Sequence, residues 1–414
     1  NYPIYISPEM DGWKLGESNM VKFSHLADCH LGAWRNQAIQ ELNLEAFRRA
    51  IEISIKEKVN FIIIAGDLFD SAYPPIDVLK ETFHIFSNLK EARIPCYLVA
   101  GSHDYSVSGK TFLDVLEKAG FCINVFKPEY KDELIYLSPV IHDNIALYGY
   151  PGRKSSLEVD DLKKIKLHNS PLFKILVLHT TLNCIKGDIP IDAFDESKLP
   201  YADYYALGHV HTDFQYEKII YPGPLFPNNF QELADLQNGG FYIVDINKDK
   251  KIDRYEIKTK EIKLIELEIK NTLSATDIIL SEINKYNLND KIVLLKLKGK
   301  LEKGKTSDIK FSQIEEEIMK KGAFAYLRNN NELKSEETNI EVETDKMEDL
   351  ESQIVQNFTK DNPSNFNNLV FQLINALSVA KQEDEKSAIF EKRLLDEIKK
   401  VVPIKIERWY RKQN

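Results

Sequence analysis

The stretch Phe61-Ile-Ile-Ile-Ala-Gly-Asp-Leu-Phe-Asp70 joins an unbroken apolar run to a glycine and two aspartates. An apolar run of this length is typical of a strand that is buried on both faces of a sheet. Helical spacing over residues 37–58 and 75–91 flanks it, and further strands are expected at 21–27 and 95–100. Strands and helices that alternate in this way predict an α/β domain.

The alternation continues along the chain and divides it into domains. A helix is expected at 109–119, and strands are expected at 145–148, 174–178, 204–207 and 241–246. Residues 250–330 contain a smaller set of strands and helices, and residues 331–363 are acidic and polar, as linkers are. We therefore expect an N-terminal extension at 1–19 before a native start at Met20, a first domain at 20–249, a small α/β domain at 250–330, a linker at 331–363 and a helical segment at 364–414.

The composition is that of an ordinary globular protein. The chain has 414 residues, enough for two or three domains, with 43% hydrophobic and 29% charged residues. Its net charge is −9, so any contact with nucleic acid must come from local basic patches. No apolar run approaches the roughly 18 residues of a membrane span. The four cysteines match no zinc-site spacing and are expected to be free thiols: Cys29, Cys96, Cys122 and Cys184.

Potential metal ligands follow five of the expected strands, each directly after the strand ends. They are Asp28 and His30, then Asp67, then Ser102, His103 and Asp104, then His179, and finally His209 and His211. Ligands in open α/β sheets bind beyond the carboxyl ends of the strands, so we expect these ends to converge within one sheet. In an extended segment, the D-x-H and H-x-H spacings would point both side chains the same way. Adjacent glycines would let the backbone approach a phosphate closely.

The ligand types indicate the chemistry. Carboxylate oxygens and imidazole nitrogens together suit manganese, iron or zinc. Two such ions roughly 3.5–4 Å apart activate a water and stabilise both oxygens of a phosphoryl displacement. A single histidine is more often structural than a ligand, but the whole ordered set favours a two-metal phosphoesterase. The other histidines receive no role, with His25 packed inside a strand, His84 on a helix, and His142 and His168 in polar surroundings.

The order Asp-x-His, Gly-Asp-x-x-Asp, Gly-Ser-His-Asp, His and Gly-His-x-His resembles the calcineurin-like metallophosphoesterase superfamily. Within it, several segments are similar to the SbcD-type nucleases, the family of the meiotic-recombination-eleven repair nuclease: Ala27–Gly32, Ala65–Pro75, His179–Thr181, Gly208–His211 and Tyr221–Gly223. The likeness covers about 20–240 strongly, and the rest of the chain by order and character only. It implies a four-layer α/β/β/α sandwich with a small α/β cap domain and a C-terminal helical hairpin.

The resemblance also implies a role for each ligand. The ligands would divide between two ions, with Asp28, His30 and His211 on one, His179 and His209 on the other, and Asp67 bridging both. His103 would contact the scissile phosphate and protonate or stabilise the leaving oxygen, a task that suits an imidazole of near-neutral pKa. Asp104 would orient His103, and Asp70 would make local hydrogen bonds.

Ser102 departs from the family pattern, which has asparagine at this position. An asparagine offers a carbonyl oxygen to the second ion, whereas a serine is shorter and its hydroxyl is a weaker ligand. We therefore expect the second ion to be bound loosely or through water. The family resemblance implies two Mn²⁺ ions as cofactors, and the ligand types also admit Mg²⁺, Fe or Zn.

Two basic regions are candidate DNA contacts. One lies in and after the strand expected at 291–301 and contains Lys296, Lys298, Lys300, Lys303 and Lys305. The first three alternate, so they would share one strand face and bind phosphates without regard to sequence. The alternative is a solvated lysine edge that deters strand pairing, but the family's cap contacts DNA. The other region is Arg153 and Lys154, after a glycine-rich turn.

The terminal helices carry apolar residues that two short helices cannot bury by themselves: Phe366, Leu369, Leu373, Leu377, Phe390 and Leu394. They are typical of a hairpin that docks on a partner, although they could also fold back on the main domain. By resemblance, the partner would be the coiled-coil base of an SMC-like ATPase. Helices around Leu79, Phe83 and Phe86 and around Phe112, Val115 and Leu116 would either form a homodimer seam or cover the sheet.

The resemblance therefore predicts a manganese-dependent DNA nuclease of double-strand-break repair, located in a prokaryotic cytoplasm near the nucleoid. It would act as a 3′–5′ exonuclease on duplex ends and as an endonuclease on single strands. One alternative is a phosphodiesterase that acts on small molecules or cyclic nucleotides. Another is a DNA-binding scaffold subunit that is catalytically weakened at Ser102.

Overall fold

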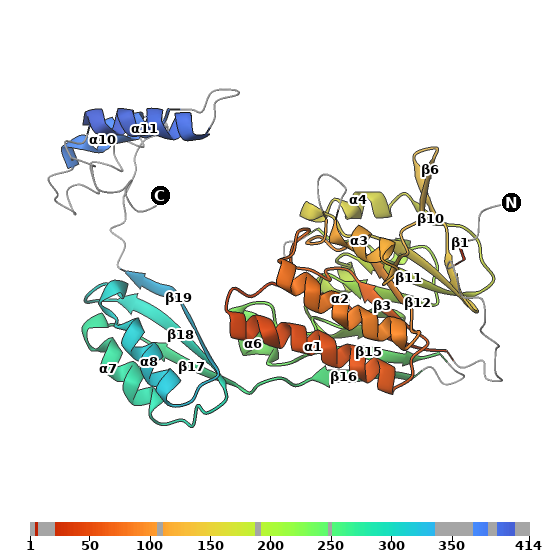
Figure 1. Ribbon diagram of the computed structural model, residues 1–414, viewed down its shortest axis with the longest axis horizontal. Helices are drawn as coiled ribbons and strands as arrows, with labels where there is room; N and C mark the ends of the chain where they lie inside the picture. The colour runs from red at the N-terminus through yellow and green to blue at the C-terminus, as the bar shows by residue number, and fades with distance from the viewer. Residues whose placement is uncertain are drawn as a thin grey trace. The chain divides into compact units, whose positions relative to one another are not determined.

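The computed structural model describes residues 5–6, 21–105, 111–186, 192–246, 251–335, 367–379 and 387–401 (Figure 1). The chain divides into two compact units, Asn1–Ser335 and Glu336–Asn414. Except for β1 (Tyr5–Ile6), the expected extension at 1–19 lies outside the described residues.

Two large sheets make up the first domain. The six-stranded sheet has the order β16 (Lys251–Ile257), β15 (Gly239–Asp245), β2 (Lys22–Leu26), β3 (Phe61–Ala65), β4 (Cys96–Val99) and β5 (Ile123–Asn124). The seven-stranded sheet has the order β1, β8 (Val140–His142), β9 (Ile145–Tyr150), β11 (Phe173–His179), β12 (Tyr204–Gly208), β14 (Ile219–Tyr221) and β13 (Phe214–Tyr216). Within each sheet the central strands run parallel, β2 to β5 in one and β9, β11, β12 and β14 in the other.

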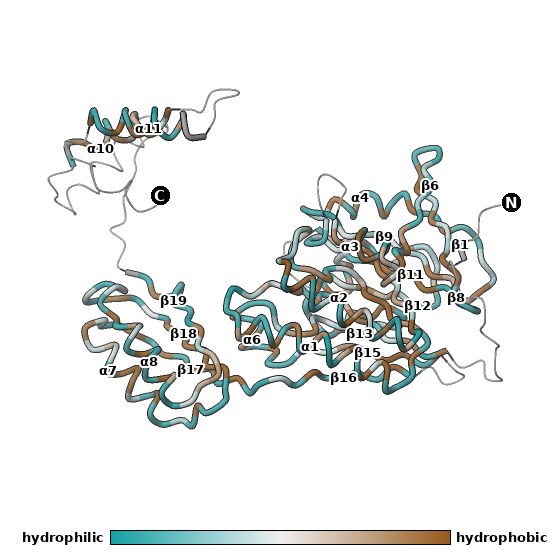
Figure 2. The backbone as a smooth tube through the Cα atoms, viewed as in Figure 1, coloured by the Kyte–Doolittle hydropathy of each residue, from teal (hydrophilic) through white to brown (hydrophobic). Residues whose placement is uncertain are grey.

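Three apolar clusters separate four layers. One lies between the sheets and includes Phe23, Phe61 and Val177. A second joins the outer face of the six-stranded sheet to three helices, α1 (Gln37–Lys56), α2 (Ile76–Glu91) and α3 (Phe112–Lys118). A third joins the outer face of the other sheet to the short helices α4 (Glu158–Leu162) and α5 (Asn183–Lys186). Figure 2, which colours the backbone by residue hydropathy, shows many of the hydrophobic residues in the strands of these layers. The expected α/β/β/α sandwich is confirmed.

The expectation that all the ligand-bearing strands share one sheet is wrong. β2, β3 and β4 belong to the six-stranded sheet, whereas β11 and β12 belong to the seven-stranded sheet. Their carboxyl ends still meet because the two sheets pack face to face with these ends on the same side. A small sheet of β10 (Ile165–Leu167), β7 (Leu134–Leu137) and β6 (Pro128–Lys131) was not anticipated.

Some residues have other surroundings than their sequence context indicated. His142 was expected in a polar environment, but it is buried and its Nδ1 lies 3.0 Å from the hydroxyl of Tyr97. Leu79, Phe86 and Leu116, which were candidates for a dimer seam, are buried in the core of their own chain. The cysteines are free thiols, as expected. Among the described residues, no helix is both long and apolar enough to span a bilayer.

The cap is a parallel three-stranded sheet with helices on one face. Its strands are β17 (Ile262–Glu268), β18 (Ile292–Leu301) and β19 (Ala325–Ser335), and α7 (Thr272–Ile283) and α8 (Phe311–Lys320) pack on them. β19 extends beyond the boundary expected at residue 330. Helix α6 (Phe230–Leu236) of the first domain contacts β17 and β19.

The second unit contains a one-turn helix η4 (Asn367–Leu369) followed by two helices, α10 (Val370–Leu377) and α11 (Ser387–Val401), which contact each other. Leu369, Leu373, Phe390 and Leu394 are half-buried there, and Leu377 is exposed. Phe366 lies outside the described residues, as does the remainder of the expected linker after Ser335.

Candidate metal centre

The predicted ligands meet at the carboxyl ends of five strands. Their donor atoms form three overlapping groups, and within each group the atoms lie within 4.8 Å of one another. The first group is Asp28, His30 and His211; the second is His30, Asp67 and His103; the last is Asp67, His179 and His209. We call the first of these the first cluster and the last the second cluster. The division matches the one that the family resemblance implies.

The two clusters are in contact through Asp67. Its Oδ2 lies 3.1 Å from His179 Nε2 and 3.5 Å from His30 Nε2. His30 Nε2 in turn lies 3.1 Å from His211 Nε2. Ring nitrogens that face each other and a carboxylate at these distances are arranged as ligands around a common ion pair would be. Asp67 is therefore placed to bridge both clusters.

Left-handed backbone brings the ligands to this place. The φ angles are +51° at Asp28, +42° at His30, +49° at Asp67 and +94° at His209. A non-glycine residue with such a backbone φ angle destabilises the fold by about 1–3 kcal/mol, and strained residues of this kind cluster at functional sites. The ligands after β2 and β12 thus converge through sharp turns of the chain, and the expectation of an extended D-x-H segment is wrong.

Glycines permit very close packing around the second cluster. An added Cβ at Gly66 would lie 2.2 Å from His179 Nδ1, and one at Gly101 would lie 2.1 Å from Asp67 Oδ1. At Gly152 it would lie 2.4 Å from His179 Cδ2, and at Gly208 it would lie 2.1 Å from the carbonyl oxygen of Ala65. Real Cβ atoms essentially never lie this close to a neighbour, so any other residue at these four positions would force the surrounding atoms to move.

The second cluster is held by backbone atoms of the sheets. His179 Nδ1 lies 2.9 Å from the carbonyl oxygen of Ala65, so Nδ1 carries a proton and Nε2 is the nitrogen that faces the Asp67 carboxylate. This Nε2 is buried and makes no hydrogen bond, although it lies beside the Asp67 carboxylate. A buried imidazole nitrogen beside a buried carboxylate fits a divalent cation, which both atoms would bind once Nε2 has given up its proton.

The first cluster is held by side chains. His30 Nδ1 lies 3.2 Å from Asp70 Oδ1, and His211 Nδ1 lies 2.9 Å from Glu232 Oε1. Such carboxylate partners orient the ring of a metal-binding histidine and make it a better ligand. Glu232 lies in α6 and was missed, because Asn229-x-x-Glu232 is an ordinary helix-start signature.

The carboxylates and histidines of the centre shift one another's pKa values. Burial opposes ionisation of Asp67, but His179, His30 and His103 hold its pKa well below the usual range. Burial likewise disfavours a charged His179, yet Asp67 and Asp28 raise its pKa to about 10. Burial and the neighbouring His179 lower the pKa of His209 to about 4. These carboxylates attract positive charge, and a metal ion that binds His179 must displace its proton.

His103 stands at the edge of the centre, with 48% of its side chain exposed. Its Nδ1 lies 2.9 Å from the backbone oxygen of Asp70 and 3.4 Å from Asp70 Oδ1. The hydrogen bond to Asp70 raises the pKa of His103 to about 9. His103 therefore carries a proton at neutral pH and can donate it.

Asp104 does not orient His103, contrary to expectation. Its carboxylate is buried and accepts hydrogen bonds from the backbone N–H groups of Leu68, Phe69 and Gly101, at 3.0–3.1 Å. It thus ties the loop after β3 to the loop after β4. The orienting contact belongs to Asp70.

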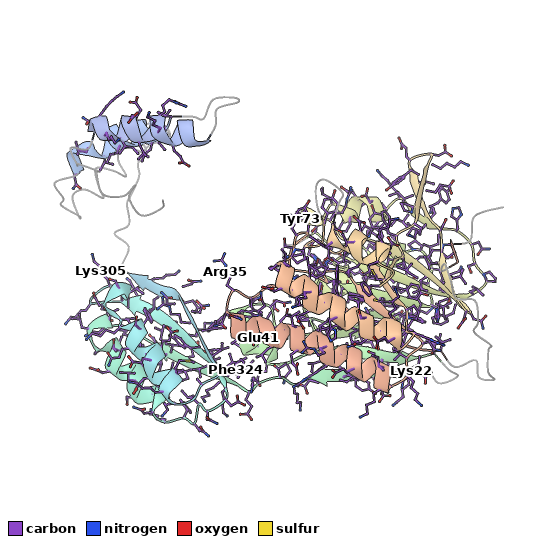
Figure 3. The ribbon with its side chains drawn as sticks, in the orientation of Figure 1. Lys22, Arg35, Glu41, Tyr73, Lys305 and Phe324 are labelled. Carbon is purple, nitrogen blue, oxygen red and sulfur yellow. The ribbon has the colours of Figure 1, made fainter. Side chains whose placement is uncertain are left out.

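A cleft of about 660 Å³ opens over His103 and His209, and Ser102 lies in its wall. Arg153 and Lys154, which were expected to meet phosphate, line it together with Tyr73 and Tyr105. Arg153 also forms an ion pair with Asp161 at 2.6 Å. Tyr73 is 63% exposed, at the surface where Figure 3 labels it.

The predicted lysine face of the cap is less basic than its sequence suggests. Lys298 pairs with Glu266 of β17 at 2.8 Å, and Lys296 pairs with Glu332 of β19 at 3.0 Å. Lys300, Lys303 and Lys305 are exposed. The carboxylates come from neighbouring strands, so a count of charges along one strand could not reveal them.

Comparisons with known proteins agree with this geometry. Residues 21–213 match the profile of the family described as Calcineurin-like phosphoesterase. The DNA double-strand break repair protein Mre11 of Archaeoglobus fulgidus is 27% identical over 284 residues, which are 60% of this chain and 62% of that protein. Mre11 of Methanosarcina mazei is 26% identical over 324 residues, 73% of this chain and 48% of that protein.

A third relative has no assigned activity. The uncharacterized metallophosphoesterase YhaO of Bacillus subtilis is 26% identical over 242 residues, which are 55% of this chain and 57% of YhaO. The chain thus spans about half to three-fifths of the length of these relatives.

Proposed function

We propose that the chain, whose residues 21–213 match the calcineurin-like phosphoesterase family, is a two-metal phosphodiesterase that cleaves DNA. One observation carries this proposal, namely the two clusters that share Asp67 beneath a cleft lined by Arg153 and Lys154. The likeness to the Mre11 double-strand break repair proteins supports DNA repair as the setting. This implies a location at the nucleoid.

The residues of the two clusters would hold the metal ions. Asp28, His30 and His211 would bind one ion, His179 and His209 the other, and Asp67 both. When bound, such ions lower the pKa of a water and neutralise charge on the phosphoryl group. We propose Mn²⁺ as the metal, and the mixture of carboxylate and imidazole ligands is compatible with it.

The other residues of the cleft would bind the substrate and transfer the proton. His103 would donate a proton to the leaving oxygen, and Asp70 would keep it protonated and oriented. Arg153 and Lys154 would hold phosphates, and Tyr73 and Tyr105 present aromatic faces on which bases can stack. An aromatic and basic cleft of this kind supports a nucleic-acid strand as substrate over a small ester.

The finer assignments extend the same proposal. Cleavage would run 3′–5′ from duplex ends and would occur endonucleolytically on single strands. Lys300, Lys303 and Lys305 of the cap would bind the DNA backbone. The α10–α11 hairpin, with its half-buried Leu373 and Leu394, would dock on an SMC-like ATPase, and the chain would act as a homodimer.

The test is cleavage of an end-labelled DNA duplex in Mn²⁺ by the full chain, by His103→Ala and by His84→Ala. His84 is an exposed histidine on α2, so its variant is a matched control. We expect the chain and His84→Ala to degrade the duplex, and His103→Ala to be slower by roughly 10²–10⁴-fold. Turnover of a small phosphodiester without any cleavage of DNA would instead identify a small-molecule phosphodiesterase, and Mn²⁺ binding without turnover would identify a scaffold.

A further inference from the structure

Helix α6 touches both the metal centre and the cap. It begins after Asn229, whose side chain accepts a hydrogen bond from the backbone N–H of Glu232 at 2.9 Å. Its first turn contacts His211, and its apolar residues pack against strands of the cap. No assigned role in the proposed reaction explains why one short helix should make both contacts.

On the side of the metal centre, α6 holds His211 through a single residue. Glu232 Oε1 accepts a hydrogen bond from His211 Nδ1 at 2.9 Å, and Glu232 Oε2 accepts one from the backbone N–H of Asn228 at 2.8 Å. The carboxylate is therefore fixed on both oxygens. It selects the His211 tautomer whose Nε2 lone pair faces His30, 3.1 Å away.

On the side of the cap, α6 belongs to one continuous apolar cluster. Leu233 is fully buried, and Phe230 and Ala234 pack against the same cluster. The cap contributes residues from its strands and from the turn before β19, namely Ile262, Leu264, Ile292, Leu294, Phe324, Ala325 and Leu327. Phe324, which Figure 3 labels, lies at the end of the cap nearest α6. A shift of these strands would therefore displace α6.

Three other ligands are held by backbone groups of the first domain. His179 is bound to the carbonyl of Ala65, Asp67 accepts a hydrogen bond from the backbone N–H of His103, and Asp28 accepts one from that of His209. These contacts lie within the loops and strands of the two sheets. His211, in contrast, is held by a helix that contacts β17 and β19 of the cap.

We infer that Glu232 is a positioning residue through which the seating of the cap on α6 controls metal binding at the first cluster. A hydrogen bond of 2.9 Å is lost if α6 moves by about 1 Å, and His211 then loses its orientation. By thermodynamic reciprocity, metal binding at the first cluster must in turn stabilise the contact between α6 and the cap. The inference rests on the two-metal centre of the proposed function.

The first test measures Mn²⁺ binding, by titration calorimetry and by the electron paramagnetic resonance signal of free Mn²⁺. It compares the full chain with Glu232→Ala, Glu232→Gln and Asp235→Ala. Asp235 is an exposed carboxylate on the same helix, hydrogen-bonded only to Gln231 among the described residues, so its variant is the control. We expect Glu232→Ala to weaken the binding of one of the two Mn²⁺ ions by roughly 10–100-fold. Glu232→Gln should lose less affinity than Glu232→Ala, and Asp235→Ala should bind both ions as the parent chain does.

The second test measures amide hydrogen exchange in the parent chain and in Glu232→Ala, with and without Mn²⁺. Exchange in α6, β17 and β19 should slow with Mn²⁺ in the parent chain. In Glu232→Ala this slowing should be lost at subsaturating Mn²⁺, whereas slowing around β3 and β11 should persist. The control variant Asp235→Ala should behave as the parent.

Each outcome separates this inference from the proposed function. A parent chain that binds no pair of Mn²⁺ ions overturns the metal centre itself. If the parent binds two ions and Glu232→Ala binds both equally well, Glu232 does not position a ligand and the inference is wrong. If Glu232→Ala weakens one ion but Mn²⁺ leaves exchange in α6, β17 and β19 unchanged, the coupling to the cap is overturned.

Discussion

The two ligand clusters are built from similar residues but are supported differently. In the second cluster, His179 is bound to a backbone carbonyl and is enclosed by Gly66 and Gly152. In the first cluster, His30 and His211 are bound to the carboxylates of Asp70 and Glu232. Backbone supports of a packed sheet have no rotamers to explore, whereas side-chain supports depend on the loop or helix that carries them. We therefore expect the second cluster to be rigid and the first to adjust with the loop and helix that support it.

We expect the largest loss of activity from a substitution that fills the space around the second cluster. In Gly101→Ala the new Cβ would lie 2.1 Å from Asp67 Oδ1 and 2.3 Å from the Asp67 backbone nitrogen. Asp67 must then move, and because it bridges both clusters we expect cleavage to fall by roughly 10²-fold or more. The measurements are the rate of duplex cleavage and the number of bound Mn²⁺ ions.

Gly120→Ala is the matched control for this variant. Gly120 has a φ of +73°, and an added Cβ there would meet only Lys90 Nζ, at 3.6 Å. The substitution should cost about 1–2 kcal/mol of stability and leave metal binding intact. If Gly101→Ala still bound both Mn²⁺ ions and cleaved the duplex at the parent rate, close packing at Gly101 would not be needed to hold the second cluster.

A smaller effect should follow when a side-chain support is altered. Hydrogen bonding to Asp70 raises the pKa of His103 to about 9, so His103 is protonated below that pH and loses its proton as the pH rises through it. In Asp70→Asn the pKa of His103 should fall towards its usual value of about 6.5. The alkaline limb of the pH–rate profile should therefore move to lower pH, with a loss of roughly tenfold at pH 8.

Asp160→Asn removes an exposed carboxylate that pairs only with Lys163 among the described residues, and its profile should match that of the parent chain. An unchanged alkaline limb in Asp70→Asn would show that His103 is not the proton donor. A drop in rate that is equal at every pH would assign Asp70 to the support of His30 alone.

The smallest expected effect is tighter metal binding at the second cluster. Ser102 and His209 both line the cleft, and Ser102→Asn would supply the carbonyl oxygen that the family pattern offers to the second ion. We expect a few-fold tighter binding of one Mn²⁺ ion and a higher rate at limiting metal concentration. Ser71→Asn, in the same cleft, is the control. Equal affinities in the parent chain and Ser102→Asn would mean that the second cluster is already complete.

The sequence could point to the candidate ligands that the fold brings together, because their signal is local. Asp28, Asp67 and His179 each follow an apolar run, and a strand end is visible within a few residues. The division into two sheets was not visible, because periodicity does not encode strand order. Alternating spacing also suggested an extended backbone, whereas the ligands adopt left-handed angles.

The supports of the ligands were largely hidden for a different reason. Glu232 meets a histidine 21 residues before it, and Asp70 meets one 40 residues before it. The assignment of Asp104 to His103 failed because adjacency in sequence did not mean contact, since its carboxylate turns inwards to backbone N–H groups. Partners across the fold follow from tertiary structure, which neither spacing nor composition specifies.

The origin of the ligands in two sheets has a consequence for folding. Asp28, His30 and Asp67 come from the six-stranded sheet, whereas His179, His209 and His211 come from the seven-stranded sheet. Neither cluster is complete until the two sheets have packed, so a partly assembled domain has no high-affinity place for an ion. Metal capture therefore marks the end of assembly, and an ion once bound links the two halves, so that opening the sandwich first requires its release.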